Sequence, residues 1–276
     1  MRDGSLRLWK KKKIKTTTSG DNIIGVVTGK QFLGFAAPVL TLILGKLAAF
    51  GFMTNSAAGV AGQPTSLASH QIILSLYFFV SPFMEVISQT AQTFIPPYAA
   101  PVIEYVNKNK VDNPASDPVI KPWLDSAFSI GTSLLKIGFI VATVISSLIS
   151  LVPAFFSGIL TSDAGVQNAA KPLAKYLWAG VFLTAPVAVS EGILLARREL
   201  KFLAGVYLFT TALLPPVLLK VKNVGGVDQV WACFAVFQLC RATLFAGRIW
   251  APSIFKAIAT LFVGKRNTEL GKEASM

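Results

Sequence analysis

Four ionisable residues interrupt otherwise apolar stretches of the sequence: Lys46, Glu85, Glu191 and Arg241. A charge at the centre of a membrane helix costs about 2.5 to 3.5 kcal/mol on insertion scales, so four charges facing lipid would cost on the order of 10 kcal/mol. That cost is comparable to the whole stability of a domain. The four side chains must therefore face one another, face a watery cavity, or reach the interface from near a helix end.

The polar side chains around Glu85 share one face of a predicted helix. Five residues have this spacing: Ser81, Glu85, Ser88, Gln89 and Gln92. The stripe either joins helices through hydrogen bonds, as Ser and Gln commonly do, or lines a path for a ligand or an ion. A carboxylate at its centre exceeds what hydrogen bonding between helices requires, which favours the path.

A second acidic face surrounds Glu191. Thr184 and Glu191 fall on the same side of a predicted helix, and Pro186 between them would kink the helix and free a backbone carbonyl. Glu191 also lies close in sequence to Arg197 and Arg198. A salt bridge at the membrane edge is therefore the alternative to a role in binding.

The last apolar stretch carries a third face: Trp231, Phe234, Gln238, Arg241 and Phe245. We interpret Arg241 as a structural partner for a carboxylate or a carbonyl rather than as a substrate ligand, with Gln238 beside it. Lys46 stays open between three roles, namely reaching the interface, pairing with Glu85, and attracting an anionic substrate.

The elements that must position these residues are membrane helices. Of the 276 residues, 53% are hydrophobic and 14% are charged, against about 25% charged in soluble domains. The composition therefore predicts an all-α membrane protein. Its six spans are expected at 32–53, 68–97, 134–157, 173–196, 200–219 and 228–250, with a polar surface connection at 98–133 that includes a short amphipathic piece. Residues 1–30 form a basic lead-in, 31–253 the six-helix unit and 254–276 an interfacial or cytoplasmic tail.

The distribution of positive charge predicts the orientation of the six spans. Segments on the side of the N-terminus hold twenty of the 26 Lys and Arg residues, and the opposite connections hold four: Lys171, Lys175, Lys220 and Lys222. Because positive charge accumulates in cytoplasmic segments, both termini are predicted to be cytoplasmic.

Several classes of function are excluded by what the chain lacks. Two Cys and one His cannot build a Cys/His metal site, and the sequence has no nucleophile elbow, zinc-protease motif or P-loop. We therefore predict that the protein is not an enzyme and that it binds no metal and no cofactor. The basic residues flank apolar blocks rather than forming a patch with exposed aromatic residues, which argues against nucleic acid as a partner.

Two segments resemble signatures of the MATE (multidrug and toxic compound extrusion) family. The first is residues 67–96, with the run SPFMEVISQTAQTFIP at 81–96, and the second is SEGILLARRELKFL at 190–203. The resemblance extends over about 32–250 and matches spans seven to twelve, the C-terminal lobe of a twelve-helix transporter. Lys46 stands at a position where many drug-exporting members carry a carboxylate. A lysine at this position is similar to the branch of the family that includes plant plastid members.

The resemblance implies an antiporter for organic compounds or xenobiotics, driven by H⁺ or Na⁺. It makes Glu85 and Glu191 the candidates for binding the coupling ion or the substrate, together with Lys46, Ser88, Gln89 and Gln92. Ser81, Thr184, Gln238 and Arg241 are assigned structural polar roles. Lys46 argues against organic-cation specificity and makes an organic anion a candidate substrate. The branch also implies a multi-pass protein of the plastid envelope.

The resemblance also implies a second six-helix lobe, which this chain lacks. The two explanations are a truncated gene model and a half-transporter that pairs with another chain. Two other functions stay as alternatives: a membrane scaffold or assembly subunit that does not transport, and a flippase for a lipid-linked substrate. Besides the second lobe, the expected partners are the lipid bilayer and a small organic substrate.

Overall fold

The computed structural model describes residues 29–60, 65–110 and 117–273, the last part from 252 onward as backbone. Six long helices form the bundle: α1 (Gly29–Ala58), α2 (Ser66–Phe94), α4 (Lys121–Phe155), α6 (Ala174–Ala196), α7 (Leu200–Val224) and α8 (Val227–Glu273). Short elements connect them: α3 (Pro96–Asn109), η2 (Ser157–Ile159), α5 (Ala164–Ala170) and η3 (Lys171–Leu173). No strand occurs within the described ranges, so the predicted all-α class is confirmed.

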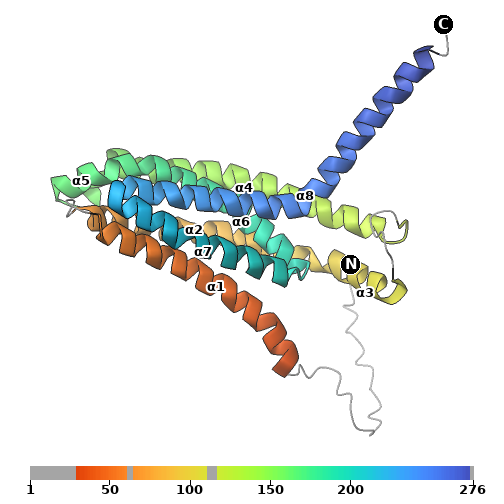
Figure 1. The fold of residues 1–276 in the computed structure, drawn as a ribbon, viewed down its shortest axis with the longest axis horizontal. Helices are drawn as coiled ribbons and strands as arrows, with labels where there is room; N and C mark the ends of the chain where they lie inside the picture. The colour runs from red at the N-terminus through yellow and green to blue at the C-terminus, as the bar shows by residue number, and fades with distance from the viewer. Residues whose placement is uncertain (1–28, 61–64, 111–116, 274–276) are drawn as a thin grey trace, which may run out of the picture.

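All six long helices contain stretches long and apolar enough to cross a membrane. They run roughly side by side along the long axis of the molecule, with α3 and α5 at opposite ends (Figure 1). Large apolar side chains cover the outside of the bundle, among them Phe79, Ile140, Leu148 and Leu208. Such a surface suits lipid rather than water.

The predicted polar connection at 98–133 contains a short helix, as expected, but it is too long at its end because the next long helix begins earlier than the predicted third span. It contains nearly all of α3, and α4 begins at Lys121, well before the expected start at 134. Two prolines lie in the first turns of these helices, Pro96 in α3 and Pro122 in α4. Proline is tolerated there because those backbone N–H groups have no partner within the helix.

The predicted boundaries at the two ends of the chain are not tested. Residues 1–28 of the lead-in lie outside the described ranges. In the region of the predicted tail, the backbone continues α8 to Glu273 and extends beyond the bundle (Figure 1). An interfacial tail at 254–276 therefore stays a prediction.

Prolines inside the spans do not break them. Each lies within a continuous helix: Pro38 in α1, Pro82 in α2, Pro153 in α4, Pro186 in α6, and Pro215 with Pro216 in α7. Because proline has no backbone N–H, the carbonyl one turn before each of them lacks its usual donor within the helix.

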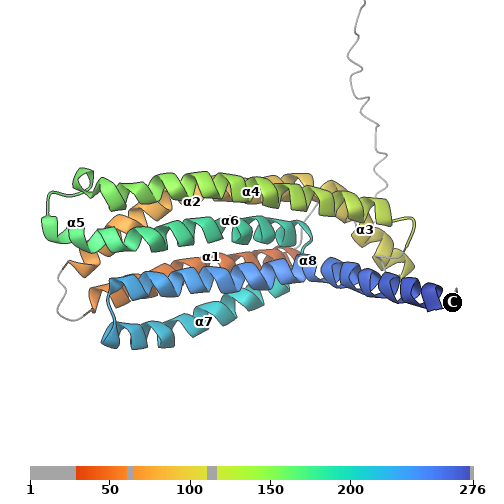
Figure 2. The same ribbon diagram turned by 90° about the horizontal axis from the view of Figure 1, so that it is seen from above.

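Helix α6 is the central element of the bundle. The apolar window of α6 and its lead-in is 72% buried, against at most 44% for the other spans. Figure 2 shows α6 between α4 and α8. Small residues let its neighbours approach closely, as a Cβ added at Gly180 would lie 3.0 Å from the Phe234 ring and one at Gly192 would lie 2.5 Å from the Ser88 carbonyl oxygen. Residues on α6 are therefore placed at the middle of the molecule.

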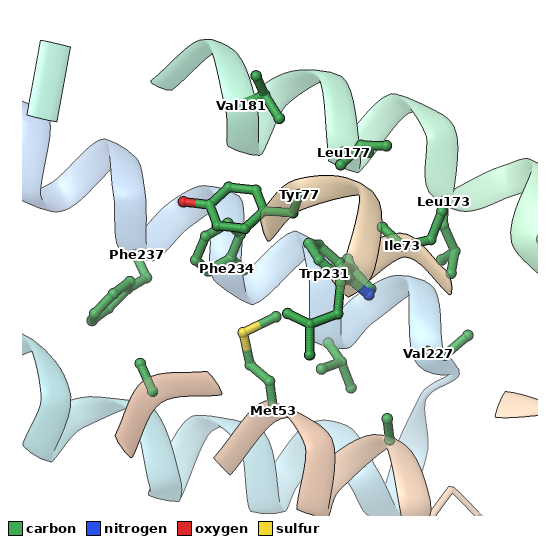
Figure 3. Close-up of a cluster of buried hydrophobic side chains, with 14 of the residues drawn as sticks. Met53, Ile73, Tyr77, Leu173, Leu177, Val181, Val227, Trp231, Phe234 and Phe237 are labelled. Atoms are coloured by element: carbon green, nitrogen blue, oxygen red, sulfur yellow. The ribbon is translucent and has the colours of Figure 1, made fainter. Parts of the chain in front are cut away.

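One half of the bundle is filled by a large apolar cluster. Met53, Ile73, Leu177 and Trp231 lie in it and are fully buried (Figure 3). Tyr77, Phe234 and Phe237 belong to the same cluster and also line the cavity described below. The packed core thus forms one wall of the candidate site.

Candidate functional site

A cavity of about 260 Å³ lies between α1, α2, α6 and α8. Its lining contains all four of the ionisable residues that interrupt the apolar spans: Lys46, Glu85, Glu191 and Arg241. These residues are spread over four helices and nearly 200 positions of sequence. The bundle therefore gathers the intramembrane charges at one place, as their insertion cost requires.

Lys46 bridges the two carboxylates. Its Nζ lies 3.0 Å from Oε1 of Glu191 and 3.3 Å from Oε1 of Glu85. The two acidic side chains differ sharply in access, since Glu191 is 7% exposed and Glu85 is 45% exposed. Glu191 is consequently the enclosed partner of Lys46, whereas Glu85 presents a carboxylate to the open side of the cavity.

Tyr207 of α7 gives Glu191 a second partner. Its hydroxyl donates a hydrogen bond of 2.6 Å to Oε2 of Glu191, and the ring is completely buried. No motif or spacing in the sequence points to this residue, although a tyrosine in the middle of an apolar span needs a partner for its hydroxyl. The two oxygens of Glu191 are thus held by different helices, Oε1 by α1 and Oε2 by α7.

Replacing Tyr207 by Phe is expected to lower the unfolding free energy by about 1 to 3 kcal/mol, because it leaves a buried carboxylate oxygen without its donor. Thermal unfolding of the purified protein in detergent measures this change. Tyr176→Phe, at a partly exposed position near the start of α6, is the control and should leave the midpoint unchanged. Equal midpoints for both variants would show that the hydroxyl of Tyr207 does not stabilise the site.

A neutral hydrogen-bond network borders the charged groups. Thr184 lies 3.0 Å from the Tyr77 hydroxyl and accepts a hydrogen bond of 2.8 Å from Nε2 of Gln238. Oε1 of Gln238 accepts a hydrogen bond from Nη2 of Arg241. This network joins α2, α6 and α8 and fixes the direction of the Gln238 amide.

The residues predicted on the Glu85 stripe divide into two groups. Ser81 and Glu85 line the cavity. Ser88 is buried against Gly192 of α6, and Nε2 of Gln92 lies 3.4 Å from Oγ of Ser88. Gln89 is exposed. The first two residues of the stripe, Ser81 and Glu85, therefore line the cavity. The later residues of the stripe pack against α6 or face outward.

The structure contradicts the salt bridge of Glu191 at the membrane edge. Arg197 pairs instead with Glu199, at 3.0 Å, and Arg248 pairs with the other oxygen of Glu199, at 2.7 Å. Glu191 lies about one and a half turns before the end of α6 and is buried in the bundle. Its cation partner comes instead from α1, whose Lys46 side chain reaches Glu191 in the cavity.

The predicted structural role of Arg241 takes a different form in the structure. Within the described ranges no carboxylate lies in ion-pair distance of its guanidinium. Its partners are Gln238 and the rings of Tyr207 and Phe237, whose centroids lie 4.9 and 4.4 Å from Cζ. A buried cation is thus held by an amide and two aromatic faces rather than by an opposite charge.

Comparison with curated proteins shows a similarity to a plant protein. The chain is 28% identical over 219 residues to Protein DETOXIFICATION 47, chloroplastic, from Arabidopsis thaliana. The alignment covers 79% of this chain and 36% of that relative, so the chain spans well under half of the relative's length. No protein-family model matches the chain, and no solved structure matches it.

This similarity, at 28% identity and over 36% of the relative's length, agrees with the resemblance of the two sequence segments to plant plastid members of the MATE family. The six apolar helices of the described ranges agree with a protein that crosses the membrane several times.

Proposed function

We propose that this chain forms one lobe of a secondary active transporter that exports an organic compound in exchange for H⁺ or Na⁺. The observation that carries the proposal is the cluster of Lys46, Glu85 and Glu191 in a cavity between membrane helices. Ionisable residues within membrane-spanning segments are costly to insert, and they typically line ion and substrate pathways.

The cluster suits coupling because one ammonium is shared by two carboxylates. Binding of H⁺ or Na⁺ at the accessible Glu85 weakens its attraction for Lys46 and leaves Lys46 to Glu191. The ion therefore changes the charge and the hydrogen bonding of the cavity that the substrate meets. Such mutual influence between two ligands is what coupled transport requires thermodynamically.

The proposal includes a second six-helix lobe, either in the same polypeptide or in another. The supporting observation is that the chain corresponds to 36% of its relative. The charge distribution supports a cytoplasmic position for both ends of the lobe, and the chloroplastic relative supports the plastid envelope as its membrane.

Sequencing the native transcript upstream of Met1 tests the arrangement of the two lobes. Six further spans in frame place both lobes in one chain, and an upstream stop codon requires a partner chain.

Glu85→Gln tests the coupling role directly. In vesicles that contain the assembled transporter, we expect the flux driven by an imposed proton or Na⁺ gradient to fall at least about tenfold, within the usual range of coupling energies. The protein should remain inserted, because Glu191 still pairs with Lys46. Glu104→Gln, at an exposed position of α3, is the matched control and should keep the flux of the unaltered protein.

The same experiment separates the alternatives. Undiminished gradient-driven flux in Glu85→Gln would contradict the coupling role. Reduced stability or weaker association of the lobes without any flux phenotype would instead support a scaffold. Transport of a polyprenyl-linked donor, with none of a small organic ion, would support a flippase.

A further inference from the structure

We propose that the turn between α6 and α7 binds the headgroup of an anionic membrane lipid, with Arg197, Arg198 and Arg248 as the contacting residues. The interaction is separate from the cavity of the candidate functional site and goes beyond the proposed transport function. It gives the lobe a lipid partner of defined charge at one end of the bundle.

The turn lies where three apolar spans end. Arg197 directly follows the apolar part of α6, and the apolar part of α7 begins at Leu200. Arg248 lies three residues before Ala251, the end of the apolar part of α8. Lipid headgroups occupy this level of a bilayer, directly outside its hydrocarbon core. Farther into the spans, large apolar side chains that suit acyl chains are exposed on α7 and α8: Leu208, Phe209 and Leu244.

Positive charge exceeds negative charge around this turn. The carboxylate of Glu199 contacts two guanidinium groups, that of Arg197 at 3.0 Å and that of Arg248 at 2.7 Å. Arg198 and Lys201 are exposed and form no ion pair with the described side chains. One carboxylate thus accompanies four cations, and the excess positive charge attracts an anionic headgroup.

Arg248 is held in place while part of its guanidinium stays free for a ligand. Its Nε donates a hydrogen bond to Oε2 of Glu199, and its Cζ lies 5.5 Å from the centre of the Phe202 ring. The side chain is 55% exposed, and its two Nη groups have no hydrogen-bond partner among the described residues. A guanidinium fixed in this way can offer both Nη groups to the oxygens of a phosphate.

Arg198 occupies a backbone position at which glycine is the usual residue. Its φ is 59°, in the left-handed region. The N–H groups of Arg198 and Glu199 donate to the carbonyls of Leu195 and Leu194, which is the hydrogen-bond pattern of a Schellman motif. A side chain in this conformation costs free energy that glycine would not. Contact with an anionic headgroup gives the exposed, cationic side chain at this position a function.

The test measures binding of phosphatidylglycerol to the purified, assembled protein in detergent micelles, with phosphatidylcholine of the same acyl chains as the zwitterionic probe. We expect saturable binding of phosphatidylglycerol that raises the unfolding temperature, as a ligand specific for the folded state does. Its affinity should be at least about tenfold higher than that of phosphatidylcholine, because several basic residues contribute. Added salt should reduce this difference, because it screens exposed charges.

Arg248→Gln should lower the affinity for phosphatidylglycerol about fivefold, the contribution typical of one basic residue near an anionic membrane surface. Lys171→Gln is the matched control. It removes the same charge at an exposed position of η3, which precedes α6 and therefore lies at the opposite end of that helix from the turn. This control should bind phosphatidylglycerol like the unaltered protein.

Arg198→Gly separates a role in binding from a role in folding. Glycine favours the left-handed conformation, so this variant should unfold in phosphatidylcholine at a temperature no lower than that of the unaltered protein. Its affinity for phosphatidylglycerol should nevertheless fall about fivefold. A loss of lipid binding without a loss of stability cannot come from misfolding.

Equal affinity for the two lipids would overturn the proposal, as would unchanged affinity for phosphatidylglycerol in Arg248→Gln and Arg198→Gly. Equal losses in Arg248→Gln and Lys171→Gln would also overturn it, because they would show an effect of net charge alone. Displacement of phosphatidylglycerol by inorganic phosphate at a similar concentration would assign the site to a soluble anion instead of a lipid. These outcomes differ from failure of the transport proposal, since gradient-driven flux that depends on Glu85 can persist without any preference for phosphatidylglycerol.

Discussion

Replacing Lys46 by Met is expected to lower the unfolding free energy by about 3 kcal/mol and to reduce transport to background. The substitution removes the ammonium that contacts both carboxylates and leaves Glu191 buried with Tyr207 as its remaining partner. Breaking a buried ion pair by removing one member typically costs 3 to 5 kcal/mol. The lower end applies because the side chain of Lys46 is 31% exposed.

A double-mutant cycle separates the structural effect from the functional one. In Lys46→Met combined with Glu191→Gln, the carboxylate that lost its cation is neutral, so much of the lost stability should return. Transport should not return, because the charges that couple ion and substrate are absent. Unfolding of each purified variant and gradient-driven flux in vesicles are the two measurements.

The control for this cycle is Lys175→Met at an exposed site near the start of α6. It should match the unaltered protein in both measurements. Additive losses of stability in the double variant would show that Lys46 and Glu191 do not interact energetically. Near-normal flux in Lys46→Met would exclude Lys46 from the transport mechanism.

Replacing Gly192 by Leu is expected to lower the unfolding free energy by about 3 kcal/mol or to prevent assembly of the bundle. A Cβ at this position would lie 2.5 Å from the carbonyl oxygen and 2.9 Å from the Cα of Ser88. Backbone atoms of α2 cannot turn aside as a flexible side chain can, so α2 and α6 would have to separate. Overpacking of this kind costs about 1 to 3 kcal/mol and occasionally more.

The same separation would displace Glu85 of α2 from Glu191 of α6, so transport should fall together with stability. Gly205→Leu is the matched control, because a Cβ at this position of α7 meets no atom within 4 Å. Unfolding temperature and size-exclusion behaviour in detergent compare the two variants. A Gly192→Leu protein as stable as Gly205→Leu would contradict the close α2–α6 contact.

The amino-acid sequence determined the class of this protein and showed which of its residues are costly to place in lipid. Six apolar stretches long enough to cross a membrane are a local property, and they correspond to six long helices in the structure. The cost of placing a charge in lipid is also local. It was therefore predictable that Lys46, Glu85, Glu191 and Arg241 must find protein partners or a cavity.

Which partners these four side chains contact depends on the tertiary structure. Glu191 pairs with Lys46, 145 positions away in sequence, rather than with the arginines that follow it. Spacing within a helix shows which residues share a face, but the neighbour of that face depends on how the helix is rotated against the others. For the same reason, Ser81 and Glu85 reach the cavity while Ser88 packs against Gly192.

Tyr207 and the unpaired edge of Arg241 illustrate the same limit. No spacing in the sequence connects Tyr207 of α7 with Glu191 of α6, and no motif shows that Arg241 lacks a carboxylate. Whether a buried polar group is satisfied depends on all the helices around it at once. The spacing of residues in a sequence describes one helix at a time. The sequence therefore showed where the charged residues lie, whereas their partners depend on the packing of the bundle.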